Sequence, residues 1–200
     1  KSSILEAIYL LSTGRSFRTH HARKMIQEGQ SSCTTFACLH RGQQLGISKN
    51  IKGQQILKRN GVQVVNMAEF AYDLPMQLIH PETMDLIESG SKQRRQLLDW
   101  LLFYLEPTFY EVWQRYQRAL LQRNALLKRD KVDDVEWLVW EQELQQQAIV
   151  LHQMRLAIFE QWLFFIEKSL VLLLPQIKIK IDYLAGFDVE QSLALQLQET

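Results

Sequence analysis

The chain has 200 residues, of which 46% are hydrophobic and 22% are charged, and its formal net charge is +1. This composition is typical of a soluble globular protein with ample material for a core. The most apolar run, at 163–174, is interrupted by Glu167 and Lys168, so the sequence excludes a bilayer-spanning segment and predicts a cytoplasmic protein with no membrane partner.

The positive charge is concentrated at one end of the chain. Residues 1–62 contain ten lysines and arginines but only two acidic residues, Glu6 and Glu28. This asymmetry indicates an anionic partner for the segment, although solvated strands and loops would give the same count.

The first predicted element is a short helix over 2–11, where apolar residues recur at helical spacing, and we expect it to be mostly buried. Short β-prone runs follow over 33–65, separated by glycine-containing turns that include Asn60-Gly61, a pair favoured in type I′ hairpins. These runs predict an antiparallel meander. A further strand is expected at 76–79.

The two cysteines, Cys33 and Cys38, lie five residues apart in a run that is predicted to be a strand. Residues an odd number apart point to opposite faces of a strand, so the two sulfur atoms cannot form a local disulfide. We therefore expect free thiols in a reducing compartment.

The middle of the chain is predicted to be helical. Ser91 suits the start of a helix that runs to about 105, and Pro107 suits the first turn of a second. A third begins at Asp133-Asp134 and ends before Pro175; about forty residues at a rise of 1.5 Å would reach about 60 Å.

Beyond this long helix, residues 177–184 alternate apolar and polar side chains as a half-exposed strand does, and 189–200 return to a helical period. The order of elements predicts an α/β fold with a helical segment inserted between strands. We expect two lobes: 1–81 form part of the first lobe, 82–175 form the helical lobe, and 176–200 return toward the first.

Lys1 and Ser2 stand directly before the first predicted helix. A phosphate-binding loop ends in Lys followed by Ser or Thr and runs into a buried helix, whose N-terminal N–H groups and dipole attract phosphate. The glycine-rich loop itself is absent from these residues, so the pair alone is a weak signal.

Three longer stretches give a more specific signal. They are "KSSILEAIYLLSTGRSFRTH" at 1–20, "LPMQLIHPETMDLIESGSKQRRQLLDW" at 74–100 and "EPTFYEVWQRYQRALLQRNALLK" at 106–128. Each resembles the RecF family of bacterial DNA replication and repair ATPases, in the right order and at the right separations. The long helix and the terminal strand match that family in texture only.

The resemblance implies an ABC-type P-loop ATPase head, similar to the heads of SMC proteins, with a helical second lobe. Lys1 would then bind ATP, Ser2 would bind ATP and ligate Mg²⁺, and Gln77 and Glu82 would be weak candidates near the γ-phosphate. Neither of these two needs a catalytic role, because a strand-edge amide and a helix N-terminal carboxylate are common structural features. The signature and acidic metal-binding segments lie later in that family, so we expect a slow ATPase in the intact protein and no hydrolysis by these residues alone, which would be a truncated piece.

The resemblance also implies an ATP-dependent homodimer that binds single-stranded and duplex DNA at gaps, works with RecO and RecR, and supports SOS induction. DNA contact should come from cations on the phosphate backbone. Each candidate could equally belong to a solvated strand face, and Arg15 and Arg18 could instead serve ATP or the dimer contact. The candidates are Arg15, Arg18, Arg23, Lys24, Lys49, Lys52, Lys58 and Arg59.

Two other functions stay open from the sequence. The long helix could dock a partner in an interaction scaffold that binds no nucleotide, or the chain could be another SMC-like or ABC-like head. Within "KQRRQLLDW", Arg95 and Asp99 are spaced as an intrahelical ion pair, and Trp113 and Tyr116 belong to an apolar helix stripe.

Overall fold

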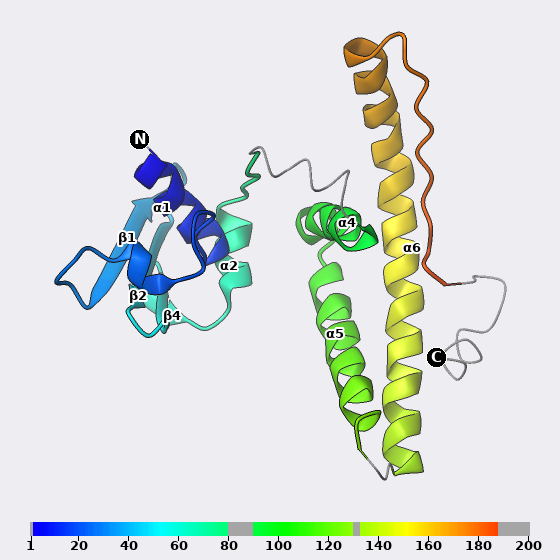
Figure 1. Cartoon of the computed structure of the whole chain (residues 1–200), viewed down its shortest axis with the longest axis horizontal. Helices are drawn as coiled ribbons and strands as arrows, with labels where there is room; N and C mark the ends of the chain where they lie inside the picture. The colour runs from blue at the N-terminus through cyan, green and yellow to red at the C-terminus, as the bar shows by residue number, and fades with distance from the viewer. Residues whose placement is uncertain (1, 80–89, 130–132, 188–200) are drawn as a thin grey trace. The chain divides into compact units, whose positions relative to one another are not determined.

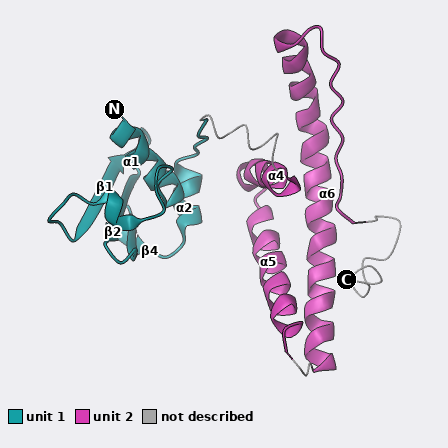
Figure 2. Ribbon diagram, in the orientation of Figure 1, with its two compact units in different colours: residues 1–83 teal, residues 84–200 magenta. Residues whose placement is uncertain are grey.

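The computed structural model describes residues 2–79, 90–129 and 133–187. The chain divides into two compact units, residues 1–83 and residues 84–200 (Figure 2). Each unit is described by itself below.

Unit 1 is built on the predicted meander. Its four strands are β1 (Ser32–Cys38), β2 (Gln44–Asn50), β3 (Gln55–Arg59) and β4 (Val62–Val64). They form one antiparallel sheet in the order β1-β2-β3-β4 (Figure 1). The prediction of a meander is confirmed, and both cysteines are free thiols.

The β3–β4 turn confirms the hairpin predicted from Asn60-Gly61. Both residues have positive φ, 51° and 81°, as a type I′ turn requires and as asparagine and glycine tolerate best. The Asn60 side-chain oxygen also accepts a hydrogen bond from the Gln44 N–H at 2.8 Å. This contact fixes the turn against the neighbouring strand.

One face of the sheet is covered by the helices α1 (Ser2–Thr13) and α2 (Met67–Asp73). The core between them combines residues from the sheet and both helices. Its buried members are Leu10, Leu11, Leu45, Ile47, Leu57 and Phe70. The alternation of strand side chains explains this arrangement, because residues two apart face the same layer.

Helix α1 differs from the prediction that it is mostly buried. Only Leu10, Leu11 and Ser12 are buried, near its C-terminal end, while Ile4 is 67% exposed and Leu5 is 60% exposed. The sequence pattern shows which helix face is apolar, but burial requires a second surface against that face. None of the described residues of unit 1 covers the first two turns.

Two further predictions in this unit are wrong. Residues 67–73 form α2, begun by Asn66, whose side chain accepts a hydrogen bond from the Ala68 N–H. Residues 76–79, predicted as a strand, have no regular structure. Their β-prone composition is insufficient, because a strand is stabilised by its neighbours and these residues pair with no strand that the structure describes.

Unit 2 is helical, with α4 (Ser91–Leu105), α5 (Phe109–Leu126) and α6 (Asp134–Leu173). These helices confirm the predicted ones closely. The Asp133 carboxylate accepts from the Val135 N–H at 2.9 Å and begins α6. Gly90 rather than Ser91 occupies the N-cap of α4, and Pro107 lies just before α5.

Helices α5 and α6 lie side by side and run in opposite directions (Figure 1). Helix α6 has 40 residues, and its buried positions Leu144, Leu151 and Ile158 recur every seven residues on the face that meets the other helices. A bidentate pair between Arg115 of α5 and Glu143 of α6, at 2.7 and 3.1 Å, fixes their register at the surface.

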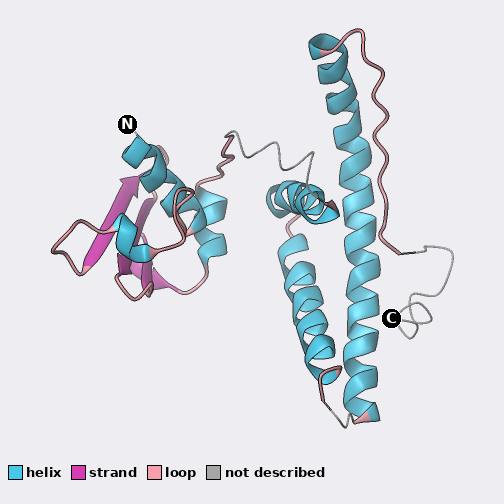
Figure 3. Cartoon of the chain, viewed as in Figure 1, coloured by secondary structure: helices cyan, strands magenta, loops and turns pink. Residues whose placement is uncertain are grey.

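The predicted strand at 177–184 is wrong. This segment is a loop that follows α6 back along its length (Figure 3), and Ile177 and Ile179 are exposed. The segment finds its contacts through side chains rather than a ladder: the Tyr183 ring lies 5.6 Å from the His152 ring and 5.7 Å from the Phe159 ring. The predicted helix at 189–200 lies outside the described residues.

Across the helices that the structure describes, we find none long and apolar enough to cross a membrane.

Candidate functional site

The N-terminal end of α1 is the first place to consider for phosphate binding. Ser2 is the first helical residue and is exposed, whereas Lys1 lies outside the described residues. The first turn contains no acidic side chain, so nothing there neutralises the unpaired N–H groups and the positive end of the helix dipole. This end can therefore accept an anion.

The C-terminal half of α1 is anchored firmly. The Ser12 hydroxyl donates to the Leu74 carbonyl at 2.8 Å, and the helix ends at Gly14, whose φ is 70°. Lys49 of β2 donates from Nζ to the Gly14 carbonyl at 2.6 Å. Lys49, a predicted DNA-binding residue, thus stabilises the helix end, where a cation meets the negative end of the dipole.

The basic segment after α1 folds back onto the helix. The Ser16 hydroxyl donates to the Glu6 carboxylate and accepts from the Arg18 N–H at 2.9 Å. The Arg18 guanidinium lies 3.5 Å from the same carboxylate, with 55% of its side chain exposed. These contacts bring Arg18 to the second turn of α1, close to the helix end described above.

The predicted basic residues of the hairpins do not share one surface. Lys58 pairs with Gly46 across the sheet and is exposed on the face away from the helices, whereas Arg59, the next residue, must point to the other face. There Arg59 makes a bidentate pair with Asp73 of α2 at 2.6 and 2.8 Å. Hydrogen bonding and then the charge of Asp73 raise the pKa of Arg59 above its ordinary value.

The remaining predicted cations are exposed. Arg15 lies in the loop after α1, Arg23 and Lys24 lie in a short 3₁₀ helix, η1 (Ala22–Met25), and Lys52 lies in the β2–β3 turn. Exposure leaves these four side chains accessible to a polyanion, but the structure does not assign any of them to DNA.

We predict different consequences for two adjacent lysine and arginine substitutions. Lys58→Gln should leave the melting temperature within about 1 °C and weaken DNA binding, because an exposed lysine contributes mainly to phosphate neutralisation. Arg59→Gln should lower the free energy of unfolding by up to about 1 kcal/mol, because it breaks the pair with Asp73. Thermal melting and a salt titration of DNA affinity measure both; equal effects of the two substitutions on melting would contradict this division.

Neither candidate for the γ-phosphate region is placed in a site. Gln77 is exposed in a loop, and its side-chain amide donates to the Leu78 carbonyl at 3.4 Å. Glu82 lies outside the described residues.

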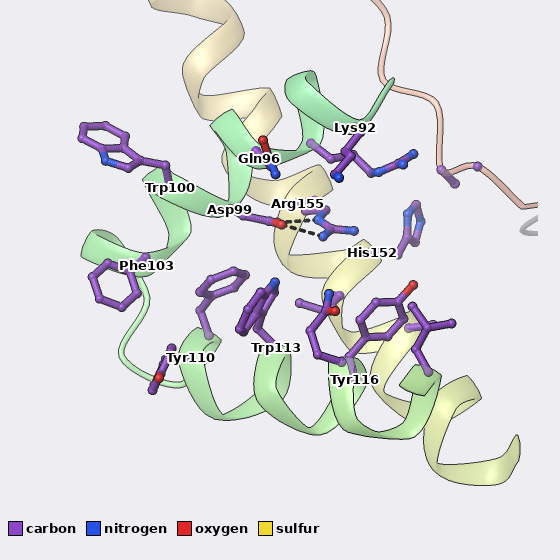
Figure 4. Close-up of a pocket in the computed structure, with 18 of the residues that line it drawn as sticks. Lys92, Gln96, Asp99, Trp100, Phe103, Tyr110, Trp113, Tyr116, His152 and Arg155 are labelled. Atoms are coloured by element: carbon purple, nitrogen blue, oxygen red, sulfur yellow. Dashed lines mark hydrogen bonds and ion pairs between the residues drawn. The ribbon is translucent and has the colours of Figure 1, made fainter. Parts of the chain in front are cut away.

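Unit 2 contains a pocket that the sequence did not reveal, with a volume of about 680 Å³. It is enclosed by α4, α5, α6 and the segment 183–187 (Figure 4). Lys92 and Gln96 of α4 and His152 of α6 line it together with several aromatic side chains. These residues are 56 to 60 positions apart along the chain, so no local motif could signal their meeting.

An ion pair at the centre of this pocket corrects the predicted pairing of Asp99. Arg155 of α6 donates to both Asp99 oxygens, at 2.7 and 2.9 Å (Figure 4). Arg95 instead donates to the Ser91 hydroxyl at 3.0 Å. The intrahelical pair is wrong because a partner across the interface offers bidentate geometry in a partly desolvated place, which is stronger than an exposed i, i+4 contact.

Tyr183 closes one side of the pocket. Its hydroxyl lies 3.2 Å from His152 Nδ1. Burial raises the pKa of Tyr183 above its ordinary value, partly offset by the positive charge of Arg155.

This raised pKa predicts an alkaline effect on stability. A group whose pKa is higher in the folded state stabilises that state below its unfolded pKa, about 10 for tyrosine, and the stability is lost as pH rises through the folded pKa. The wild-type chain should therefore lose stability above about pH 10 more steeply than Tyr183→Phe, which has no proton to lose. Melting temperatures from pH 8 to 11 measure this, and parallel curves would refute it.

Curated proteins match this chain along nearly its whole length, although no family model does. It is 44% identical over 198 residues to "DNA replication and repair protein RecF" of Acinetobacter baumannii ATCC 17978, which is 98% of this chain. It is 36% identical over 204 residues to the protein of the same name from Cellvibrio japonicus.

The resemblance to RecF is thereby confirmed. The chain spans about half the length of the curated relatives it matches, 55% of the Acinetobacter protein. Two solved structures, described as the recombination mediator protein RecF-ATPrS and RecF-ATP in the RecFOR pathway, match 99% and 98% of this chain with TM-scores of 0.75 and 0.76. At 23% and 20% identity they show the fold. The predicted α/β fold class of a RecF-type head is confirmed.

Proposed function

We propose that the protein carrying this sequence is a RecF-type DNA replication and repair protein, an ATP-dependent clamp that closes on DNA by dimerising. The observation that supports this most is the 44% identity to a RecF protein along 98% of the chain. The relatives similar in fold are described with ATP or an ATP analogue and with the RecFOR pathway. RecO, RecR, gapped single-stranded and duplex DNA, and SOS induction are its proposed partners and context.

The end of α1 fits ATP and Mg²⁺ as far as it is described. Ser2 is exposed at the first turn, where no acidic side chain repels an anion. We propose that Ser2 ligates Mg²⁺ through its hydroxyl and that Lys1 contacts the terminal phosphates. Bound ATP with Mg²⁺ supplies the negative charge that this helix end is suited to stabilise.

The anchoring of α1 gives this end a fixed position. Leu10 and Leu11 are buried, and Ser12 bonds to the Leu74 carbonyl, so the C-terminal half cannot shift without breaking the core. A helix that is rigid at one end presents its other end at low entropic cost. Arg18 lies along the same helix through Glu6, where it could contact a nucleotide phosphate or the second protomer.

DNA binding in this proposal is carried by exposed cations and is largely independent of sequence. Lys58 and Lys52 on the sheet and Arg15, Arg23 and Lys24 near η1 are the accessible candidates. Lys49 and Arg59 contribute less, because both are engaged within unit 1. Slow ATP hydrolysis belongs to the whole protein and is not expected from these 200 residues alone.

The experiment replaces Lys1 by methionine in the whole protein that carries this sequence. Lys1→Met should abolish ATP-dependent binding to gapped DNA without changing the melting temperature, because methionine keeps the length of the side chain but not its charge. Lys168→Met, which removes an exposed charge from α6, is the matched control and should bind normally. Normal ATP-dependent binding by Lys1→Met would contradict the proposal.

One observation favours the scaffold as a second candidate. The far part of α6 exposes large apolar side chains: Phe164 is 63% exposed, Phe165 is 61% exposed and Leu172 is 85% exposed. Such a surface is typical of a protein-protein contact. If Lys1→Met changes nothing while Phe164→Ser with Phe165→Ser abolishes repair activity in cells, the scaffold is the better account.

A further inference from the structure

The pocket of unit 2 has no role in the proposed function, which uses the end of α1 and the exposed cations of unit 1. Its volume of about 680 Å³ lies within the range of roughly 300–1,000 Å³ that is typical of small-molecule sites. All its lining residues belong to the described part of unit 2. The pocket is therefore complete without the other unit.

The charge at the pocket is positive. Arg155 and Asp99 neutralise each other in their bidentate pair. Lys92 and Arg95, one turn apart on α4, also line the pocket, and both are exposed. Apart from Asp99, no acidic side chain is among the described residues that line the pocket, so this side attracts an anion.

The opposite wall is aromatic. Trp113 and Tyr116 project from α5 toward α4, and Tyr110 is stacked on Trp113 with an interplanar angle of 13° and ring centroids 6.4 Å apart (Figure 4). These rings are only half-buried, so part of each face is open to the pocket. Flat unsaturated rings stack on such faces with little regard to their identity.

Polar groups between the two walls complete the site. Gln96 and Gln117 supply amides that can donate and accept hydrogen bonds, and His152 supplies a ring nitrogen. The walls are helices, whose backbone groups are already paired internally. An extended peptide would therefore find no strand edge to bind, whereas a base with a phosphate meets amides, rings and cations.

We infer that this pocket binds a nucleoside phosphate, with the base against Trp113 and Tyr116 and the phosphate at Lys92 and Arg95. The ligand is either a free nucleotide or one unstacked nucleotide of a single strand. The inference goes beyond the proposed function and stands on unit 2 alone. It adds a second, weaker contact for nucleotides to the one at α1.

The test uses photocrosslinking to a single-stranded thymidine oligomer that carries one 5-iodouracil, with the site of attachment read by mass spectrometry. In the full chain, attachment is expected at Trp113 or Tyr116 of α5. Lys92→Gln with Arg95→Gln should reduce attachment on the order of tenfold and lower the salt dependence of binding by about one to two phosphates. Lys128→Gln with Lys168→Gln removes the same charge from exposed positions of unit 2 and should change attachment less than twofold.

The outcomes separate the sources of the ligand. Competition by free deoxyadenosine monophosphate as well as by unlabelled oligomer supports a free nucleotide, and competition by the oligomer alone supports a strand. Attachment only outside α5, an equal loss in both double variants, or competition by an acidic peptide but by neither nucleotide would overturn the inference. Lys1→Met should leave attachment unchanged, so failure of this proposal is distinguishable from failure of the ATP site.

Discussion

Phe70→Ala is expected to lower the free energy of unfolding of unit 1 by about 3–5 kcal/mol. Phe70 has no exposed surface and packs in the core that joins α1, α2 and the sheet. Removing its ring loses the transfer free energy of the buried carbons and leaves a cavity that a close-packed core fills only in part. Domains of this size are stable by only about 5–15 kcal/mol, so the loss is a large fraction of the total.

Hydrogen exchange of the β2 amides measures this loss, because the central strands open only with the core. Val65→Ala is the control, since Val65 is 96% exposed and its substitution should change stability by less than about 0.5 kcal/mol. Similar exchange rates in Phe70→Ala and Val65→Ala would show that α2 does not hold the sheet in the way described.

Asp99→Ala is expected to destabilise unit 2 by about 2–3 kcal/mol. The loss leaves the Arg155 guanidinium, whose side chain is only 15% exposed, without its partner. A partly buried charge that loses its counterion keeps the cost of desolvation and gains nothing in return. The cost should fall when Arg155→Leu is added, because the unpaired charge is then removed as well.

A double-mutant cycle of Asp99 and Arg155, followed by thermal melting, measures the coupling between them. Asp182→Ala is the matched control, because the Lys180–Asp182 pair has side chains that are 86% and 57% exposed and should contribute under about 1 kcal/mol. Equal losses at Asp99 and Asp182 would contradict the structural role of the central pair.

Features set by local chemistry could be predicted from the sequence. The Asn60-Gly61 turn and the glycines between strands fix the meander, because their backbone conformations are accessible to few other residues. Asp133 and Pro175 bound α6 for equally local reasons. In each case, neighbouring residues decide the structure.

Features set by distant partners could not be predicted. Residues 76–79 and 177–184 have the composition of strands but find no strand to pair with among the described residues, and composition does not reveal a missing partner. Helix α1 has an apolar face that the described residues of unit 1 only partly cover. The amphipathic pattern is the same whether or not a face is covered.

The candidate sites follow the same division. Alternation along β3 is a local signal that is sufficient to separate Lys58 from Arg59, because adjacent strand residues point to opposite faces. The choice of Arg155 over Arg95 by Asp99 has no such signal, because it joins residues 56 positions apart. The pocket of unit 2 depends on the same packing of α4 on α6.

The central claim is that the end of α1 binds the phosphates of ATP. Calorimetric titration of ATP with Mg²⁺ into the whole protein tests it most directly, with Lys168→Met as the control for the loss of one lysine. The account predicts that Lys1→Met abolishes measurable ATP binding while the control binds as the wild type does. ATP binding by Lys1→Met with the affinity of the wild type would contradict it.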